Sequence, residues 1–251
     1  MSLGSRLTLA NSSAENTMKN GLIGTSAFQR SMNDYNAATD GELLSDSRFN
    51  LIMGGCLLWG FLINALICTL FGHQISALVE GNAGVALGVI LGYFVFAFGG
   101  TYICHKSKKP AISFLGYNLI VLPMGIMLSV ILTAYPVMTI SYAFAVTAVV
   151  TFACIVISTA KPDFFRKLGH GLFVSIVVGI LAEVVCVFLF PGVLGIFDWA
   201  FAILFCGYIG YDWVRSQEVP STLDNAVDCA CALYIDIINL FIRVLSIMGK
   251  K

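Results

Sequence analysis

The stretch AISFLGYNLIVLPMGIMLSVILTAYPVMTISYAFAVTAVVTFACIVISTA, residues 111–160, contains no Asp, Glu, Lys or Arg. A helix needs roughly 20 apolar residues to cross a bilayer, so this stretch is long enough for two such helices. Pro136 interrupts it, and we therefore expect one span over 111–135 and another over 140–160. Both runs are too long and too uniformly apolar for membrane-spanning strands, which alternate apolar and polar residues.

Further apolar runs of similar length lie on both sides of this stretch and predict more membrane-spanning helices. They cover residues 49–71, 82–104, 168–190, 193–213 and 226–248. Pro191 and Gly192 separate two of these runs, as Pro136 does in the central stretch. The last run is the least apolar, because it contains Asp228, Asp236 and Arg243. The predicted fold class is an all-α polytopic membrane protein, a bundle of seven transmembrane helices.

The composition of the chain supports this class. Hydrophobic residues make up 58% of the sequence and charged residues 11%, against about 25% charged residues in a typical soluble domain. Nine of the 28 charged residues lie in residues 1–48. We interpret 1–48 as a flexible polar cytoplasmic tail and 49–251 as the membrane domain. The net charge of zero gives no indication of a nucleic-acid partner, and none is expected.

The distribution of basic residues predicts the orientation, because Lys and Arg favour the cytoplasmic side. They occur before the first span and after the second, fourth and sixth, at Arg6, Lys19, Arg30, Arg48, Lys106, Lys108, Lys109, Lys161, Arg166, Lys167 and Arg215. The intervening loops have none, which places the N-terminus in the cytoplasm. Seven spans then place the C-terminus outside, where Arg243, Lys250 and Lys251 conflict mildly with the rule, so a re-entrant last helix is an alternative.

Motifs for enzymatic or metal chemistry are missing from the sequence. No Walker loop, GxSxG, HExxH or GxGxxG pattern occurs. The eight cysteines are scattered without CxxC spacing, and most lie in apolar runs, where Cys acts as a small hydrophobic residue. We expect no disulfide framework, no zinc site, no cofactor and no enzymatic activity.

A run of glycines at four-residue spacing, Gly84, Gly88 and Gly92, marks the second span. Residues four apart share a helix face, and glycine lets another backbone approach closely. The favoured interpretation is a helix–helix contact within the bundle. A homodimer face is the alternative.

Ionisable residues at membrane depth are costly and therefore indicate function. Four stand out: Glu183, Asp212, Asp236 and Arg243. Asp236, Asn239 and Arg243 follow each other at spacings of three and four, so they share one face of the last span. This polar stripe is expected to face the interior of the bundle.

Asp212 and Asp236 lie on consecutive helices joined by a loop of roughly a dozen residues, so these helices are antiparallel neighbours. The two carboxyl groups reach a similar depth if the last helix begins near Leu223 or if the helices tilt. Two carboxyls in a low-dielectric site cannot both ionise cheaply, so such a pair shares a proton. Its oxygens also suit Ca²⁺. The alternative is two carboxyls that are satisfied independently.

The residues around these two aspartates resemble a known family. GYIGYDW (207–213) and ALYIDIINLFIRVLSIMG (232–249) are similar to the Bax inhibitor-one family, also called the transmembrane Bax inhibitor motif family. That family has a Tyr–Asp pair closing its sixth helix, matched by Tyr211 and Asp212. Its last helix carries LYLD-[FI]-INLF. The matches there are Leu233, Tyr234, Asp236, Ile238, Asn239, Leu240 and Phe241.

The resemblance implies a bundle with the last helix central, surrounded by three helix pairs. It also implies a pH-sensitive Ca²⁺ leak in which Asp212 and Asp236 form the proton-sensing pair and contact the ion. Ca²⁺ and H⁺ would then be the transported and regulatory ions, and the bilayer the main partner.

Members of the family can hold a basic latch residue at the cytoplasmic end of the second helix. That region reads CHKSKK here, so the counterpart is His105, Lys106 or none. Glu183 and Arg243 do not match the family pattern. Arg243 could supply a substitute countercharge, because it lies seven residues after Asp236.

Two other functions fit parts of the sequence. One is a non-transporting protein that binds a membrane partner, such as a protease or a regulator of cell death. The other is an intramembrane aspartyl protease, since aspartates on two neighbouring helices can share a proton. The last span reads LYID, however, where those enzymes have GxGD. With no lumenal glycosylation pattern, a bacterial plasma membrane is favoured over the endoplasmic reticulum.

Overall fold

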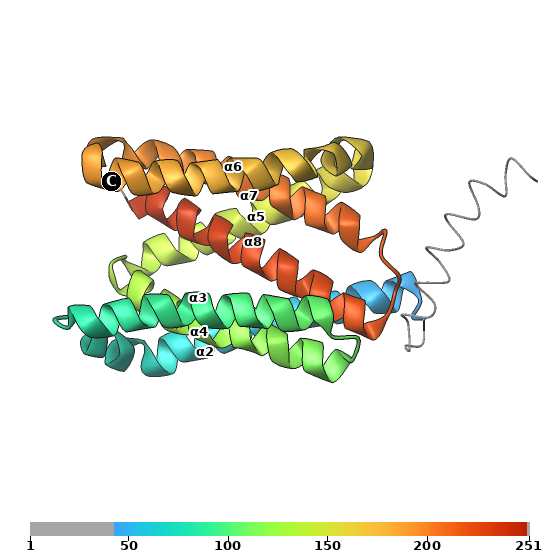
Figure 1. Cartoon of the computed structure of the whole chain (residues 1–251), viewed down its shortest axis with the longest axis horizontal. Helices are drawn as coiled ribbons and strands as arrows, with labels where there is room; N and C mark the ends of the chain where they lie inside the picture. Colours follow the sequence, from blue (N-terminus) through green and yellow to red (C-terminus); the bar gives the residue numbers. More distant parts are fainter. Residues whose placement is uncertain (1–42, 250–251) are drawn as a thin grey trace, which may run out of the picture. The chain divides into compact units, whose positions relative to one another are not determined.

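The computed structural model describes residues 43–249 (for Pro191, the backbone only). This part of the chain has seven long helices, all apolar and long enough to cross a membrane, and no strands. The helices are α2 (Asp46–Val79), α3 (Ala83–Lys106), α4 (Pro110–Thr133), α5 (Val137–Ala160), α6 (Pro162–Leu189), α7 (Leu194–Ser216) and α8 (Leu223–Gly249), with a 3-10 turn η1 (Pro191–Val193). The predicted all-α bundle with seven membrane-spanning helices is therefore confirmed (Figure 1).

The helix boundaries follow the breaks predicted from the sequence, with three differences. Pro136 caps the N-terminus of α5, and η1 separates α6 from α7. In contrast, α2 continues to Val79, well past residue 71. Two helices begin earlier than predicted, α6 at Pro162 instead of Leu168 and α8 at Leu223 instead of Ala226. The loop between α7 and α8 is thus 217–222, about half the expected length. The predicted tail lies outside the described residues except for 43–48.

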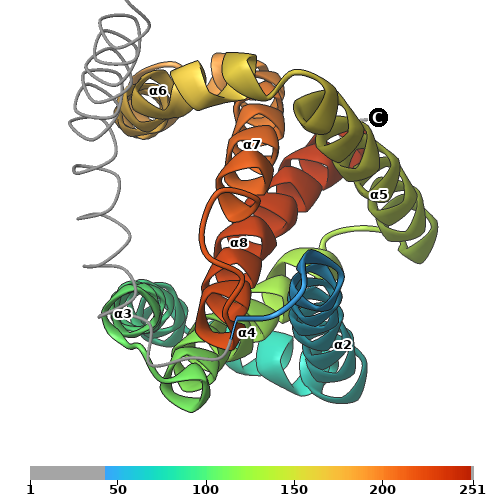
Figure 2. The same ribbon diagram turned by 90° about the vertical axis from the view of Figure 1, so that its right-hand side faces the viewer.

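The helices pack as two groups of three, with α8 in contact with both. In the first group, α4 packs against α2 and α3; in the second, α7 packs against α5 and α6 (Figure 2). The last helix, α8, packs against α2, α3 and α4 and also against α5 and α7. This grouping by threes differs from the three pairs implied by the resemblance. That α8 is central stays a prediction, since α4 is as buried as α8.

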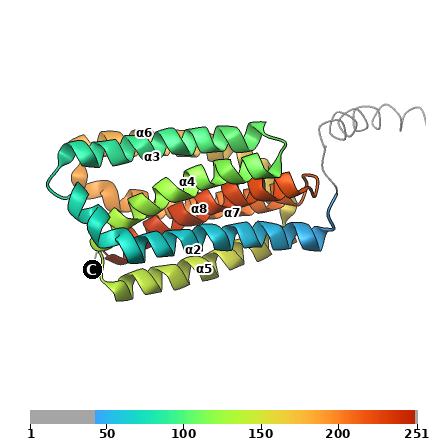
Figure 3. The ribbon, with the colours of Figure 1, turned by 90° about the horizontal axis from the view of Figure 1, so that it is seen from below.

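Polar contacts join the predicted cytoplasmic ends of several helices at one end of the bundle. Leu44 N–H donates to the carbonyl of Ser221, and the side-chain amides of Asn50 and Gln217 bond each other. Arg166 pairs with Glu218, and the indole of Trp213 donates to Thr159. Figure 3 shows the up-and-down course of the chain that brings these ends together. The basic residues of alternate loops therefore share one end of the bundle.

The glycine run of α3 does not make the predicted contact within the bundle. A Cβ at Gly88 or Gly92 would meet no atom within 4 Å, and one at Gly84 would meet only the capping side chain of Asn82. The close contact of α3 lies further along, where a Cβ on Gly100 would come within 2.5 Å of the backbone oxygen of Gly116. The intramolecular role predicted for the run is therefore wrong, because α3 turns a different face to α4. Dimerisation through this run stays a prediction.

Candidate functional site

Asp212 is positioned by glycines that press α7 against α6. A Cβ on Gly210 would lie 2.2 Å from the ring of Phe165, and one on Gly207 would lie 2.9 Å from Leu172. Both glycines therefore face α6. At 100° per residue, Asp212 is about 200° around the helix from Gly210 and points away from α6. The GYIGYDW motif thus combines a packing face and a carboxyl on opposite sides of one helix.

Asp236 is positioned by the tyrosine two residues before it. The Tyr234 ring is fully buried and packs edge-on against the ring of Tyr117 in α4, with centroids 5.5 Å apart. Its hydroxyl accepts a hydrogen bond from the Asn64 side-chain amide in α2 at 2.5 Å. These contacts fix the rotation of α8. Because Tyr234 faces α2 and α4, Asp236 is directed about 200° away.

The two carboxyl groups interact across the α7–α8 contact. Asp236 is buried, with 6% of its surface exposed, and Asp212 is half-buried. Each carboxyl acts electrostatically on the other, and a hydrogen bond can join them once one of the two holds a proton. The phenol of Tyr208, one turn before Asp212, lies within range of both. Within residues 43–249, neither aspartate forms an ion pair.

The basic residues proposed for a latch differ in where they lie. His105 and Arg215 are the cationic or potentially cationic groups within electrostatic range of Asp212. Lys106 instead donates to the hydroxyl of Tyr102 on its own helix, at 2.7 Å, and its ammonium lies over that ring. Asn239 also forms its hydrogen bond within its own helix, where its side-chain amide donates to the carbonyl of Ile235 at 2.8 Å. The sequence reasoning did not consider Arg215 for this position.

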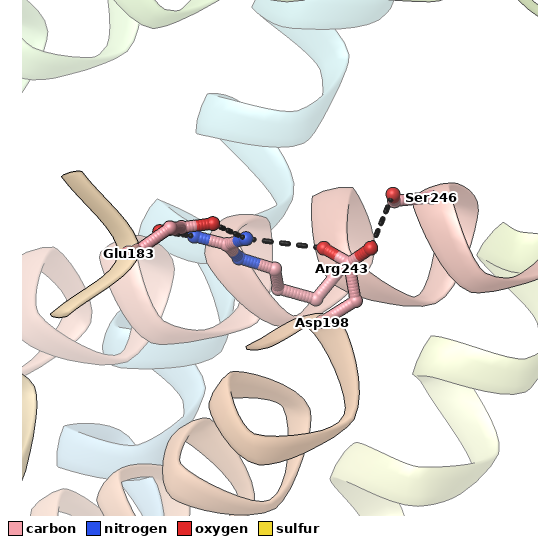
Figure 4. Close-up of polar contacts among 4 residues, drawn as sticks. All are labelled: Glu183, Asp198, Arg243 and Ser246. Carbon is pink, nitrogen blue, oxygen red and sulfur yellow. Dashed lines mark hydrogen bonds and ion pairs between the residues drawn. The ribbon is translucent and has the colours of Figure 1, made fainter. Parts of the chain in front are cut away.

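Arg243 lies in a second polar cluster, together with Glu183, Asp198 and Ser246 (Figure 4). Its Nη1 and Nη2 donate to the two carboxylate oxygens of Glu183 in α6, at 2.6 and 2.8 Å. Nη1 also donates to Asp198 of α7 at 3.1 Å, and the Ser246 hydroxyl donates to the other Asp198 oxygen at 2.7 Å. The guanidinium stacks over the ring of Phe201, 4.4 Å from its centroid. One arginine thus ties together α6, α7 and α8.

The suggestion that Arg243 is a countercharge for Asp236 is therefore corrected. Seven residues of helix separate the two by about 10 Å along the axis, and the guanidinium is engaged by two other carboxylates. Asp198, which is 5% exposed, was missed by the sequence reasoning. The sequence did contain an indication of this residue, because Asp198 is a single acidic residue within the apolar run 193–211. Its partner could not be read from the sequence.

A further acidic group lies at the start of α8. Asp224 accepts a hydrogen bond from the hydroxyl of Ser113 in α4 at 2.7 Å, and Asp228 follows one turn later. Buried polar atoms without a hydrogen-bond partner in the described residues include Oδ1 of Asp228 and Oδ2 of Asp236. Over residues 43–249, no group of three or more His, Cys, Asp or Glu side chains is arranged to hold a metal ion. The eight cysteines are free thiols.

Comparisons with known proteins agree with the motif resemblance. A family profile described as "Inhibitor of apoptosis-promoting Bax1" matches residues 48–251. A protein named Golgi anti-apoptotic protein from vaccinia virus is 28% identical over 171 residues, covering 68% of this chain and 70% of its own length. The BI1-like protein of Arabidopsis thaliana is 25% identical over 207 residues, covering 79% and 77%. An uncharacterized membrane protein of Streptococcus pyogenes is 24% identical over 189 residues, covering 72% and 81%.

Proposed function

The chain belongs to the Bax inhibitor-one family, and from this premise we propose that it is a pH-sensitive calcium leak channel. In this proposal, protonation of the Asp212–Asp236 pair controls the passage of Ca²⁺ along α7 and α8. Ca²⁺ is the transported ion, and no cofactor is involved. The observation that carries the proposal is a buried carboxyl, Asp236, whose interacting neighbour is a second carboxyl on the adjacent helix.

The electrostatics of this arrangement support proton sensing. A buried carboxylate without a compensating partner is strongly disfavoured, so Asp236 is stable only with a proton or a cation nearby. Oδ2 of Asp236 has no hydrogen-bond partner in the described residues, and Arg243 is committed to other carboxylates. Two carboxyls that share a proton titrate as a unit. A change in pH therefore alters the charge at the α7–α8 contact, where both ion attraction and helix packing respond.

Replacing Asp236 with asparagine tests the proposal. Asparagine has nearly the shape of a protonated aspartic acid but cannot titrate, so we expect Ca²⁺ flux into proteoliposomes to lose its dependence on pH. Asp212→Asn is expected to have the same effect, because the pair titrates as a unit. The measurement is the initial rate of uptake reported by an encapsulated Ca²⁺ dye, over a series from acidic to neutral pH.

A matched control is Glu80→Gln, which removes an exposed carboxylate at the end of α2 and is expected to leave the pH profile unchanged. Unchanged flux with an unchanged pH profile in both Asp→Asn variants would contradict the proposal. A wild-type chain that carries no Ca²⁺ at any pH would also contradict it. Circular dichroism and the elution volume of each purified variant establish that it is folded.

A second function, a non-transporting interaction protein that regulates a membrane protease or a cell-death or stress partner, is favoured by one observation. The viral relative is named an anti-apoptotic protein, and such a role can be carried by binding alone. In that case the glycine run of α3, in which Gly84 and Gly88 are exposed, is a candidate contact face for a partner or for a second copy. A membrane protein that co-purifies equally with the wild-type chain and with Asp236→Asn would support this function.

The seven apolar helices make the chain an integral multi-pass membrane protein. Relatives occur in bacteria, in a plant and in a virus. A bacterial plasma membrane stays our proposed location. Localising a tagged full-length chain in its own host is the direct test.

A further inference from the structure

A deep groove opens between α2 and α5. Both helices pack against α8, but they hardly touch each other. Figures 2 and 3 show them on the same side of α8. The groove has a volume of about 910 Å³, which is near the upper end of the usual range for small-molecule sites. Its floor includes Leu233, Ile237 and Phe241 of α8.

The lining of the groove identifies the chemistry that fits it. No residue with a charged side chain lines it, and its polar lining is limited to a few amides, hydroxyls, a thiol and one indole. A hydrated cation or a charged peptide would lose its hydration there without compensation. The rims carry exposed apolar side chains, among them Leu51, Leu58, Phe144 and Phe152. In a chain that crosses a membrane, these rims continue the lipid-facing surface into the groove.

The dimensions and the ends of the groove are those of a lipid tail site. Along α2 the lining runs from Asn50 to Cys68, about 27 Å at 1.5 Å per residue, close to the ~30 Å of a bilayer's hydrocarbon core. One end carries the amide of Asn50 and the indole of Trp213. Indoles favour the membrane–water interface, so this end lies at the level of lipid headgroups.

We propose that this groove binds one phospholipid from the leaflet in which α2 begins and α7 ends, with an acyl chain seated between α2 and α5. The acyl chain of the lipid covers the apolar floor formed by α8 and fills the space between α2 and α5. Lipid tails are as apolar as the lining, so association inside a bilayer rests on close van der Waals packing of the acyl tail in the groove, as helix contacts there do. The site is independent of the proposed calcium leak, because it contains neither Asp212 nor Asp236.

The glycines of α2 provide a direct test. A Cβ on Gly54, which lines the groove, would meet nothing within 4 Å, so a phenylalanine there can occupy the groove without displacing protein atoms near the backbone. Gly88 of α3 is equally open but lies outside the groove, which makes Gly88→Phe the matched control. The full-length chain is reconstituted in phosphatidylcholine vesicles and extracted in mild detergent. Native mass spectrometry then counts the phospholipids that remain bound.

We expect the wild-type chain and Gly88→Phe to retain one phospholipid at a detergent concentration that removes all others. Gly54→Phe should lose it, with at least a tenfold lower retained fraction. A second pair of variants tests the groove from α5 in case Gly54→Phe does not fold. Ala148 lines the groove, so Ala148→Phe should also lose the lipid. Ala145 lies on α5 outside the lining, and Ala145→Phe is the control. No retained lipid in the wild-type chain, or equal retention in the groove variants and their controls, would overturn the proposal. Calcium flux is not needed for either result.

Discussion

Arg243→Met is expected to destabilise the folded chain by about 3 kcal/mol, the lower end of the range for breaking a buried ion pair. The substitution keeps most of the side-chain volume but removes the guanidinium that bonds to both Glu183 and Asp198. Two carboxylates are then left together, with side chains only 24% and 7% exposed. We choose the lower end because Glu183 is the less buried of the two. The measurement is unfolding of the purified chain in mixed detergent micelles, followed by circular dichroism.

The carboxylates provide the control for this prediction. Glu183→Gln combined with Asp198→Asn in the Arg243→Met background removes the two carboxylate charges that Arg243 bonded and should recover more than half of the lost stability. A double-mutant cycle between Arg243→Met and Glu183→Gln is expected to give a coupling of at least about 1 kcal/mol, because the two side chains share two hydrogen bonds. Additive effects of the two substitutions would contradict the assignment of the cluster as a tie between α6 and α8.

Gly100→Leu is expected to be the second large effect, because it separates α3 from α4. Even a Cβ at this position would approach the backbone oxygen of Gly116 to 2.5 Å and the Ile120 side chain to 2.7 Å. A backbone atom cannot move aside as a flexible side chain can, so the helices must part. Overpacking of this kind costs about 1–3 kcal/mol or more. Since α3 has few other buried residues, we expect lower thermal stability in detergent and faster proteolysis in the loops that flank α3.

The neighbouring residue is a matched control. Gly99 is exposed, and a Cβ there would meet nothing within 4 Å. Gly99→Leu should therefore leave the melting temperature unchanged or raise it slightly, because leucine favours a helix over glycine by somewhat under 1 kcal/mol. If Gly99→Leu and Gly100→Leu destabilise equally, the close α3–α4 crossing is not what holds α3 in place.

The sequence predicted the seven helices because hydrophobicity and length act locally along the chain. The charge-free run 111–160, interrupted at Pro136, contains two helices whose break is where the proline requires it. The same reasoning underestimated α2, α6 and α8 at their polar ends. Helices continue past the apolar core where capping and tertiary contacts satisfy their end turns. At the start of α8, for example, Asn225 N–H donates to the hydroxyl of Thr222, which a hydropathy pattern does not reveal.

Partners between helices could not be predicted in the same way, because they depend on the rotation of each helix about its axis. The glycine run at Gly84, Gly88 and Gly92 has the spacing of a contact face, yet Gly100 makes the contact with α4. Asp236 and Arg243 share a helix face in the sequence, but Arg243 reaches Glu183 and Asp198. Spacing defines which residues share a face, and only packing defines what that face meets.

By itself, the sequence determined that this chain is a bundle of membrane-spanning helices and that Asp212 and Asp236 are exceptional within it, since both conclusions follow from the cost of polarity in a bilayer. The tertiary structure decided which charges neutralise each other and where the bundle is open. It assigns Arg243 to a cluster with Glu183 and Asp198, leaving Asp236 with a carboxyl neighbour. It also leaves a groove between α2 and α5. The physical reason is that both outcomes depend on the relative rotation and spacing of helices distant in the sequence.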